Sequence, residues 1–369
     1  MQADLQTAFE NWVVFSPGTV LYTKQVIGHR SVSAAISLDH SSACPMFYRP
    51  LGSTGMTVSQ LAFGAGPISG LMTGEDANGQ LATVRRALDV GINWFDTAAT
   101  YGDGHSETNL GQALQTLGAT ERVHIASKVR LTPADLVDVS GAIRRSVRQS
   151  CRRLGVTKIT LLQLHNAITA NREDEPTSIT PADVLGPGGV AEVFGQLQMD
   201  GLVRHVGLTA IGSASALSEV VQSGRFDTIQ VPYNLVNPSA GMKCPADFVE
   251  VNYGDVVGQC AARGIAAFAI RVYAGGALVG NAPSSHTLKT KFFTLDLYHR
   301  DQRKVAAMAE HLPDGVTLKE AALRFVISHP HVSSAIVGFG SPAHVDEAVA
   351  FLESGPLGDD IVDALLTIN

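Results

Sequence analysis

The chain has 369 residues, 45% of them hydrophobic, and a formal net charge of −7, which is enough for one α/β barrel of roughly 250–320 residues with a large core. The acidic balance and the lack of a long basic run argue against nucleic acid as a partner, and no apolar stretch reaches the roughly 18 residues that a membrane span requires. The four cysteines are widely spaced and form no C-x-x-C pair, a pattern that suits a reducing cytoplasm and argues against a disulfide framework or a cysteine metal site.

Residues 1–45 differ from the rest of the chain. They contain W-V-V-F, a Ser-Pro-Gly turn and a Ser-rich stretch, but not the order of charge, apolar core and small cleavage residues that marks a signal peptide. A regular pattern starts directly after Met46. We therefore interpret 1–45 as an N-terminal extension, either poorly ordered or the product of a mis-called start, and 46–369 as a single domain.

The domain opens with Tyr48–Gln60, which predicts a β-hairpin with its turn at Gly52–Gly55 and a place at the bottom of a barrel. The next run, L-A-F-G-A-G, predicts a short strand that ends in Gly64 and Gly66. These glycines have no side chain, so a ligand or another backbone can approach closely, and we expect both to contact a cofactor.

Beyond this strand, strand-like runs alternate with segments of helical spacing, such as Ser140–Leu154, Gly212–Val221 and the apolar positions between Leu318 and Val326. The eight expected strands are L-A-F-G, N-W-F-D, Val123–Ser127, Ile159–Leu164, Val203–Leu208, Thr228–Val231, Ala266–Ile270 and Ser334–Val337.

This alternation predicts parallel strands, and eight repeats predict a closed (β/α)8 TIM barrel. An open doubly wound sheet is the alternative, but the first strand is not followed by G-x-G-x-x-G with an acidic residue about 20 positions later. Two long insertions, Ala167–Gly189 and Tyr273–Asp301, follow expected strands. On the active face of a barrel such loops shape a substrate pocket or a lid, although plain surface decoration is the alternative.

Polar residues follow three consecutive expected strands. Asp96 ends N-W-F-D, Tyr101 lies five residues later in a glycine-bracketed loop, Lys128 closes V-H-I-A-S-K, and His165 follows I-T-L-L-Q-L. Taken singly, such residues are more often helix caps, surface charges or core histidines. Taken together they lie at the end of the barrel that carries enzyme sites, and we interpret them as one catalytic group.

The chemistry of this group is proton transfer at a carbonyl or alcohol oxygen. A free phenol has a pKa of about 10, and an ammonium within about 4–6 Å lowers it by favouring the phenolate. A carboxylate keeps the lysine charged and aimed, while a neutral histidine donates a hydrogen bond to a carbonyl oxygen. Because no side chain can move a hydride at carbon, the group implies a nicotinamide cofactor.

These residues resemble the aldo-keto reductase superfamily from Tyr48 nearly to the C-terminus. The motif Y-R-x-L-G-x-T-G-x-x-V-S is similar to the family's entry hairpin, and G-I-N-W-F-D-T-A-x-x-Y-G with G-x-S-E-x-x-L-G is similar to its most specific signature. The resemblance places the family's catalytic tetrad on Asp96, Tyr101, Lys128 and His165. It implies that NAD(P)H binds extended across the barrel top without a Rossmann domain.

The same resemblance assigns contacts to the nicotinamide half of the cofactor. Thr209 in V-G-L-T-A stands where a Ser or Thr holds the carboxamide, with Ala210 in place of the usual Asn, and Gln230 in I-Q-V-P-Y-N matches the carboxamide-binding Gln. After the seventh strand Ile270 replaces a stacking aromatic and Arg271 replaces a serine. We expect Arg271 to reach the pyrophosphate.

At the adenosine end, the last strand and its helix resemble the family's phosphate-binding segment. Gly338, Gly340 and Ser341 are expected to meet the adenosine phosphate at the helix N-terminus, where free amides and the helix dipole favour anions. The arginine common in NADP-using members is His344 here, and a final Asn is Ala348.

Residues 336–350 contain no Lys or Arg, and a 2′-phosphate requires such a partner. Asp346 and Glu347 instead suit the hydroxyls of an adenine ribose. We therefore expect NAD to serve at least as well as NADP.

The insertion after His165, T-P-A-D-V-L-G-P-G-G and G-L-T-A-I-G further resemble the branch with D-threo-aldose and L-galactose or L-fucose type dehydrogenases.

The expected function is a cytoplasmic NAD(P)-dependent oxidoreductase acting on a small aldehyde, an aldose or a sugar lactol. The alternative is a dinucleotide-sensing regulatory subunit with little turnover, against which the complete tetrad argues. Metal-dependent hydrolysis needs clustered His and Asp ligands at strand ends, and only His165 lies there. The exact substrate, the physiological direction and the oligomeric state do not follow from the sequence.

Overall fold

The computed structural model describes residues 46–245, 248, 250–280, 282–283 and 295–368, together with the short strands β1 (Val14–Phe15) and β2 (Thr19–Val20). β1 and β2 pair antiparallel. The interpretation of residues 1–45 as a separate extension otherwise lies outside the described residues. The unit that begins at Cys44 is described by itself below.

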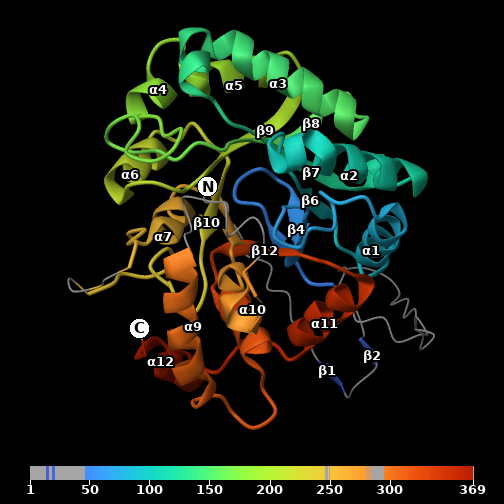
Figure 1. Cartoon of the computed structure of the whole chain (residues 1–369), viewed down its shortest axis with the longest axis vertical. Coiled ribbons are helices and arrows are strands. Elements are labelled where there is room, and N and C mark those ends of the chain that lie inside the picture. Colours follow the sequence, from blue (N-terminus) through green and yellow to red (C-terminus); the bar gives the residue numbers. More distant parts are fainter. Residues whose placement is uncertain are drawn as a thin grey trace, which may run out of the picture. The chain divides into compact units, whose positions relative to one another are not determined.

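Eight parallel strands close into a barrel, and each strand is paired with its neighbours in chain order (Figure 1). The strands are β5 (Leu61–Gly64), β6 (Trp94–Asp96), β7 (His124–Val129), β8 (Ile159–Leu164), β9 (Val203–Thr209), β10 (Thr228–Pro232), β11 (Ala266–Ile270) and β12 (Val332–Gly338). The predicted TIM barrel is confirmed, and the open sheet is excluded because β12 pairs with β5. β7 extends past the predicted end at Ser127, so Lys128 lies within the strand.

Helices follow the strands and pack side by side around the outside: α1 on α2, α2 on α3, α3 on α5, and α10 and α1 on α11 (Figure 1). Their bounds are α1 (Ala77–Asp89), α2 (His105–Thr116), α3 (Val139–Leu154), α4 (Pro181–Leu185), α5 (Val190–Met199), α6 (Ala214–Gln222), α7 (Val256–Ala261), α9 (Leu295–Ala309), α10 (Leu318–Ser328), α11 (Pro342–Glu353) and α12 (Asp359–Leu366). The short 3-10 helices are η1 (Tyr101–Gly104), η2 (Thr120–Arg122), η3 (Pro133–Val137) and η4 (Ala274–Val279).

Local sequence explains where a helix such as α3 begins and ends. The Asp138 side chain accepts a 2.8 Å hydrogen bond from Gly141 N at the N-terminus, and Gly155 adopts the left-handed conformation directly after Leu154. These are the usual cap residues for the two ends. Within the described residues, no helix is both long and apolar enough to cross a bilayer.

The hairpin of β3 (Tyr48–Pro50) and β4 (Thr57–Ser59) closes the bottom of the barrel, as predicted. Its apolar residues Leu51, Met56 and Val58 pack into the barrel interior with Trp94 and Phe268. A second, larger apolar layer lies between the strands and the surrounding helices. The barrel interior is therefore filled by apolar side chains at the bottom.

Arg49 fastens the hairpin to the end of the chain. Its guanidinium donates to the carbonyl oxygens of Ile327 and Val332, each at 2.6 Å, and of His329 at 3.0 Å. These carbonyls belong to the end of α10 and the start of β12, where helix and strand would otherwise leave acceptors unpaired. The hairpin is thus tied to the last barrel strand.

Strand register decides which side chains face the barrel interior, because residues paired in register point to the same side of the sheet. The pairs that carry predicted site residues are Gly338 with Gly64, Gly64 with Asp96, Lys128 with Gln163, Thr209 with Gln230, and Pro232 with Ile270. The predicted site residues on strands thus share the inner face near the carboxyl ends.

The two predicted insertions differ in the structure. In residues 167–189, Ile168 forms bridges with Ile179 and Gly212, and α4 follows. In the second, η4 follows β11 and α9 already begins at Leu295, while residues 281 and 284–294 lie outside the described part of the chain. A third long connection, residues 233–255 between β10 and α7, was not singled out from the sequence.

His329 makes the fold sensitive to acid. Its Nδ1 accepts from His331 N at 3.2 Å and its Nε2 lies 3.0 Å from Gly241 O, so the neutral ring with a proton on Nε2 satisfies both contacts. Burial, together with electrostatic interactions with His331 and Arg49, lowers the pKa of His329, although Gly241 O and Asp255 oppose this. A lowered folded-state pKa means that stability is lost as pH falls below the ordinary value of 6.5.

We expect His329→Gln to weaken this dependence, because glutamine keeps a donor for Gly241 O and carries no titrating proton. The melting temperature between about pH 7.5 and 5.5 should fall less in the variant than in the wild type. His311→Gln, at an exposed position, is the matched control and should leave the slope unchanged. Equal slopes in His329→Gln and the wild type would contradict the assignment.

Candidate active site

Asp96, Lys128 and Tyr101 meet at the top of the barrel. Lys128 Nζ donates to Asp96 Oδ1 and, at 2.8 Å, to Thr97 O. The same nitrogen lies 3.4 Å from Tyr101 Oη and 4.9 Å from the centre of its ring. Asp96 is 3% and Lys128 1% exposed, so the phenol is the member of the group nearest to solvent. The predicted juxtaposition of amine and phenol is present.

The charge of Lys128 is stabilised by its neighbours. Burial alone would lower the pKa of Lys128, but attraction to the Asp96 carboxylate, followed by interaction with Tyr101, outweighs it and the pKa is raised. Such a lysine stays an ammonium at neutral pH and is held against the phenol. This is the electrostatic arrangement expected of a proton-transferring tyrosine.

The loop after β6 sets the position of Tyr101. Gly102, Asp103 and Gly104 all have positive φ, at 56°, 53° and 94°, a conformation that glycine adopts freely and that costs a non-glycine residue roughly 1 kcal/mol or more. A Cβ on Gly104 would lie 2.7 Å from Arg153 Cδ. The tight turn therefore needs both glycines, and it keeps Tyr101 close to the strand end.

His165, the residue directly after β8, joins the group. Its ring meets the ring of Tyr101 edge-on, with centroids 5.6 Å apart, and its Nδ1 lies 3.4 Å from Thr100 Oγ1. The structure therefore brings all four predicted catalytic residues together. Gly66 lies beside them, since a Cβ at this position would be 3.7 Å from Tyr101 Cε2.

Two glutamines that contact Asp96 add to the predicted group. Gln163 Nε2 donates to Asp96 Oδ2 at 3.1 Å, and Gln230 Nε2 donates to the same oxygen. Gln163 was not considered from the sequence, although strand alternation puts it on the face of His165, two residues later. Gln230 was expected to hold a carboxamide, and that role stays a prediction, but its donor end is engaged by Asp96.

A second cation lies near the phenol. Arg130 follows the end of β7 and was also missed from the sequence. Burial lowers the pKa of Arg130, and attraction to Tyr101 partly offsets this. The site therefore has more positive charge than the predicted group alone. Among the described residues, no group of three or more His, Cys, Asp or Glu is placed to hold a metal ion.

The inner face of the barrel top has features that fit a nicotinamide. Thr209 Oγ1 is buried and has no hydrogen-bond partner among the described residues, as expected of a hydroxyl that awaits a ligand amide. Gly64 and Gly338 pair in register, and a Cβ on Gly64 would come within 3.1 Å of Val337 O. Ile270 packs at the rim of the interior cluster. It presents an apolar surface where an aromatic was the family expectation.

At the N-terminus of α11, the predicted phosphate-binding residues lie together. Ser341 is the N-cap and its side chain makes no capping hydrogen bond. Gly340 N donates to His344 Nδ1 at 3.2 Å. One of the amides that was assigned to the phosphate is therefore already bonded to the His344 imidazole. The terminus retains the dipole and the remaining amides that suit an anion.

In the structure, the two carboxylates that were expected to bind the ribose hydroxyls are already paired with cations of other helices. Glu347 is paired with Lys319 of α10, and Asp346 with Arg86 of α1. Residues 336–350 contain no Lys or Arg, but packing brings two cations to α11 from elsewhere in the chain. Each is matched by a carboxylate, so the face gains no unpaired positive charge from these two pairs.

Arg271 has an unusual backbone and a compensated charge. Its φ is +56°, and its carbonyl accepts from Ala274 N at 2.7 Å and Asn234 Nδ2 at 2.9 Å. A Cβ on Gly275 would lie 3.1 Å from Arg271 Nη2. Burial lowers the pKa of Arg271 to about 10, and Asp301 partly offsets this.

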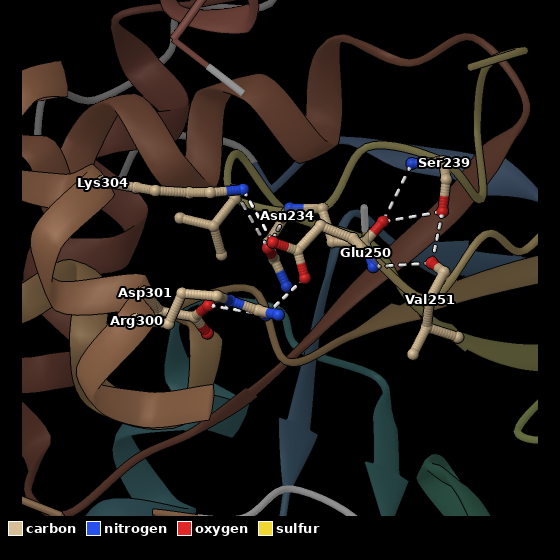
Figure 2. Close-up of polar contacts among 9 residues, drawn as sticks. Asn234, Ser239, Glu250, Val251, Arg300, Asp301 and Lys304 are labelled. Carbon is tan, nitrogen blue, oxygen red and sulfur yellow. Dashed lines mark hydrogen bonds and ion pairs between the residues drawn. The ribbon is translucent and has the colours of Figure 1, made fainter. Parts of the chain in front are cut away.

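Figure 2 shows the ion cluster around Asp301. Buried Glu250, from the 233–255 connection, is paired with Arg300 and, at 2.8 Å, with Lys304 of α9, and Arg300 also contacts Asp301 at 3.2 Å. The cluster ties α9 to this connection beside Arg271. The expected contact of Arg271 with a pyrophosphate stays a prediction.

A family model described as the aldo/keto reductase family matches residues 60–369. The chain belongs to this family. It is 25% identical to L-galactose dehydrogenase of Arabidopsis thaliana over 82% of this chain and 86% of the relative. It is 26% identical to D-threo-aldose 1-dehydrogenase of a Pseudomonas species over 79% of this chain and 89% of the relative.

Among solved structures, the holo form of the aldo-keto reductase AKR11C1 from Bacillus halodurans matches with a TM-score of 0.66. Identity is 22%, over 88% of this chain and 96% of that chain, so this likeness concerns the fold. The predicted family resemblance is confirmed. As an aldo/keto reductase, the protein is an oxidoreductase of a family that uses nicotinamide cofactors.

Proposed function

We propose that this aldo/keto reductase is an NAD(P)-dependent enzyme that interconverts a carbonyl and an alcohol in a small aldehyde, an aldose or a sugar lactol. The single observation that carries the proposal is the position of Lys128 Nζ, which contacts the Asp96 carboxylate and lies 3.4 Å from Tyr101 Oη. The dehydrogenase relatives support the substrate class, because both are named for sugars.

The residues have separate roles in this proposal. In reduction, Tyr101 Oη gives its proton to the carbonyl oxygen, and in oxidation it takes the proton of the alcohol. Lys128, held by Asp96, stabilises the phenolate that remains. His165, edge-on to the Tyr101 ring, orients the substrate oxygen by a hydrogen bond. A bound nicotinamide dinucleotide would supply or accept the hydride at carbon.

In this scheme, two sets of residues would hold the two ends of the cofactor. Thr209 would hold the carboxamide through its unpartnered hydroxyl, with Gln230 beside it in register. Gly338, Gly340 and Ser341 would meet the adenosine phosphate at the α11 terminus.

The direct test is the absorbance change of reduced nicotinamide against aldoses, lactols and pyridoxal-like aldehydes, with NAD and NADP run in parallel. Turnover of at least one class is expected. Tight cofactor binding without turnover across the whole panel would instead favour a dinucleotide-sensing subunit and overturn the enzymatic proposal.

We further infer that NAD serves at least as well as NADP. The cations that approach α11, Arg86 and Lys319, are both paired with carboxylates, so a 2′-phosphate would have to compete for them. A kcat/KM that favours NADP by about 100-fold, equivalent to about 2.7 kcal/mol, would contradict this inference.

Asp346→Asn tests the same inference from the opposite direction. It frees Arg86 from its carboxylate partner, so the kcat/KM ratio of NADP to NAD should rise relative to the wild type. Asp360→Asn, at an exposed position in the first turn of α12, is the control and should leave the ratio unchanged.

A further inference from the structure

Gln163 contacts the acid–base group from inside the barrel. It is fully buried, and its Nε2 donates to Asp96 Oδ2 at 3.1 Å. It touches neither Tyr101 nor Lys128 in any described hydrogen bond. Gln163 is the register partner of Lys128, but its side-chain hydrogen bond goes to Asp96, so the carboxylate is the route by which its donor can act on the phenol.

The contacts of Asp96 divide between its two oxygens. Oδ1 accepts from Lys128, and Oδ2 accepts from Gln163 and Gln230. A carboxylate can rotate about its Cβ–Cγ bond, and the two amides resist this rotation because either would lose its acceptor. With Oδ2 held in this way, Oδ1 stays aimed at Lys128 Nζ.

Gln163 is tightly enclosed on the inner face of the barrel. Gly207 is its register partner on β9, and a Cβ on Gly207 would lie 3.3 Å from Gln163 Cγ, although its closest contact would be Thr228 Oγ1 at 2.3 Å. Gln163 Oε1 is itself buried without a partner among the described residues. Burying a polar amide in this way is unfavourable, whereas an apolar side chain would avoid the penalty. The donation to Asp96 is the described side-chain hydrogen bond of Gln163, and it points to a role for this donor.

We propose that Gln163 is a positioning residue of the reaction, which fixes the orientation of the Asp96 carboxylate and, through it, the placement of Lys128 against Tyr101. The inference rests on the proposed function, because it assigns Gln163 a part in the acid–base chemistry of Tyr101. Gln230 also donates to Asp96 Oδ2, but it faces the expected cofactor site as well. A substitution at Gln163 therefore tests the positioning role without also removing an expected cofactor contact.

Two variants of similar size separate this role from packing. Gln163→Met keeps the length and removes the donor. Gln163→Glu presents an O–H donor to Asp96 Oδ2 while its carboxyl group is protonated, and a second negative charge once that proton is lost. Both are compared with Gln259→Met, which removes a glutamine amide bonded to Ser218 and Gly254 O away from the barrel interior.

The experiment measures kcat and KM against pH for full-length protein with a substrate found active in the panel, together with cofactor affinity by fluorescence titration and thermal unfolding. Gln163→Met should lower kcat by about 10-fold, the effect of losing one hydrogen bond to a charged group, with KM and cofactor affinity within about twofold. Gln163→Glu should recover activity relative to Gln163→Met as the pH is lowered, and lose it again as the introduced carboxyl group ionises. Gln259→Met should behave as the wild type.

The proposal is overturned if Gln163→Met keeps wild-type kcat across the pH range, or if the profiles of the two Gln163 variants coincide. A fall in melting temperature with unchanged kcat would show a purely structural role and would also overturn it. Failure of the proposed function has a different signature, namely no turnover by the wild type or full turnover by Tyr101→Phe. In that case the defect lies with the assigned tyrosine and not with Gln163.

Discussion

Tyr101→Phe is expected to lower kcat by about 10²–10⁴-fold, the range attributed to a positioned general acid or base. The variant keeps the aromatic ring that meets His165 edge-on and removes only the hydroxyl that lies 3.4 Å from Lys128 Nζ. Substrate and cofactor should therefore still bind. The measurement is steady-state turnover in both directions, with cofactor affinity determined separately by fluorescence titration.

A matched control is Tyr48→Phe, which removes a hydroxyl bonded to Gly91 O at the hairpin. Its kcat should be that of the wild type. Near-normal turnover by Tyr101→Phe would reject the assigned acid–base role. Loss of cofactor binding in this variant would show that the Tyr101 hydroxyl acts in cofactor binding and not in catalysis.

Lys128→Met is expected to abolish turnover and to lower the free energy of unfolding by about 3–5 kcal/mol, because it leaves the buried Asp96 carboxylate without its charged partner. The wild-type contribution has a defined pH dependence. Since the folded-state pKa of Lys128 is raised above its ordinary 10.5, the pair stabilises the protein fully below that value and is lost only as the pH rises through the folded-state pKa. Denaturant unfolding at neutral pH measures the cost.

The double variant Asp96→Asn with Lys128→Met separates charge from packing. Removing both charges should recover most of the lost stability but none of the activity. Replacing both members of a buried ion pair costs less stability than removing one member, because no unpaired charge is left buried. Arg144→Met breaks the partly exposed pair with Asp200 and should cost less than about 1 kcal/mol. A single Lys128 variant no less stable than the Arg144 variant would contradict the buried-charge argument.

Most of the predicted fold and site follows from local patterns in the sequence. The spacing of Asp96 and Tyr101 across one glycine-bracketed loop, and the positions of Lys128 and His165 at the next two strand ends, follow from local alternation and the shared direction of parallel strands. The order of the eight strands follows from the same regularity, because each helix-containing connection leads to the neighbouring strand. The proximity of these four residues therefore follows from the sequence, and their catalytic role stays a prediction.

The contacts made across the barrel could not be predicted in this way. Gln163 reaches Asp96 over a sequence separation of 67 residues and Gln230 over 134, and the choice of acceptor for an amide depends on side-chain rotamers within a closed interior. Strand alternation gives the face of a side chain but not the atom that it meets.

The same limit applies at the cofactor end. The sequence by itself determined that α11 carries carboxylates and no Lys or Arg, which led to the expectation of NAD. Only the tertiary structure decided that Arg86 and Lys319 arrive there from α1 and α10 and pair with Asp346 and Glu347. The physical reason is that the fold and its catalytic strand ends are set by short-range periodicity, whereas the charge at a surface is the sum over helices that are distant in the chain and adjacent in space.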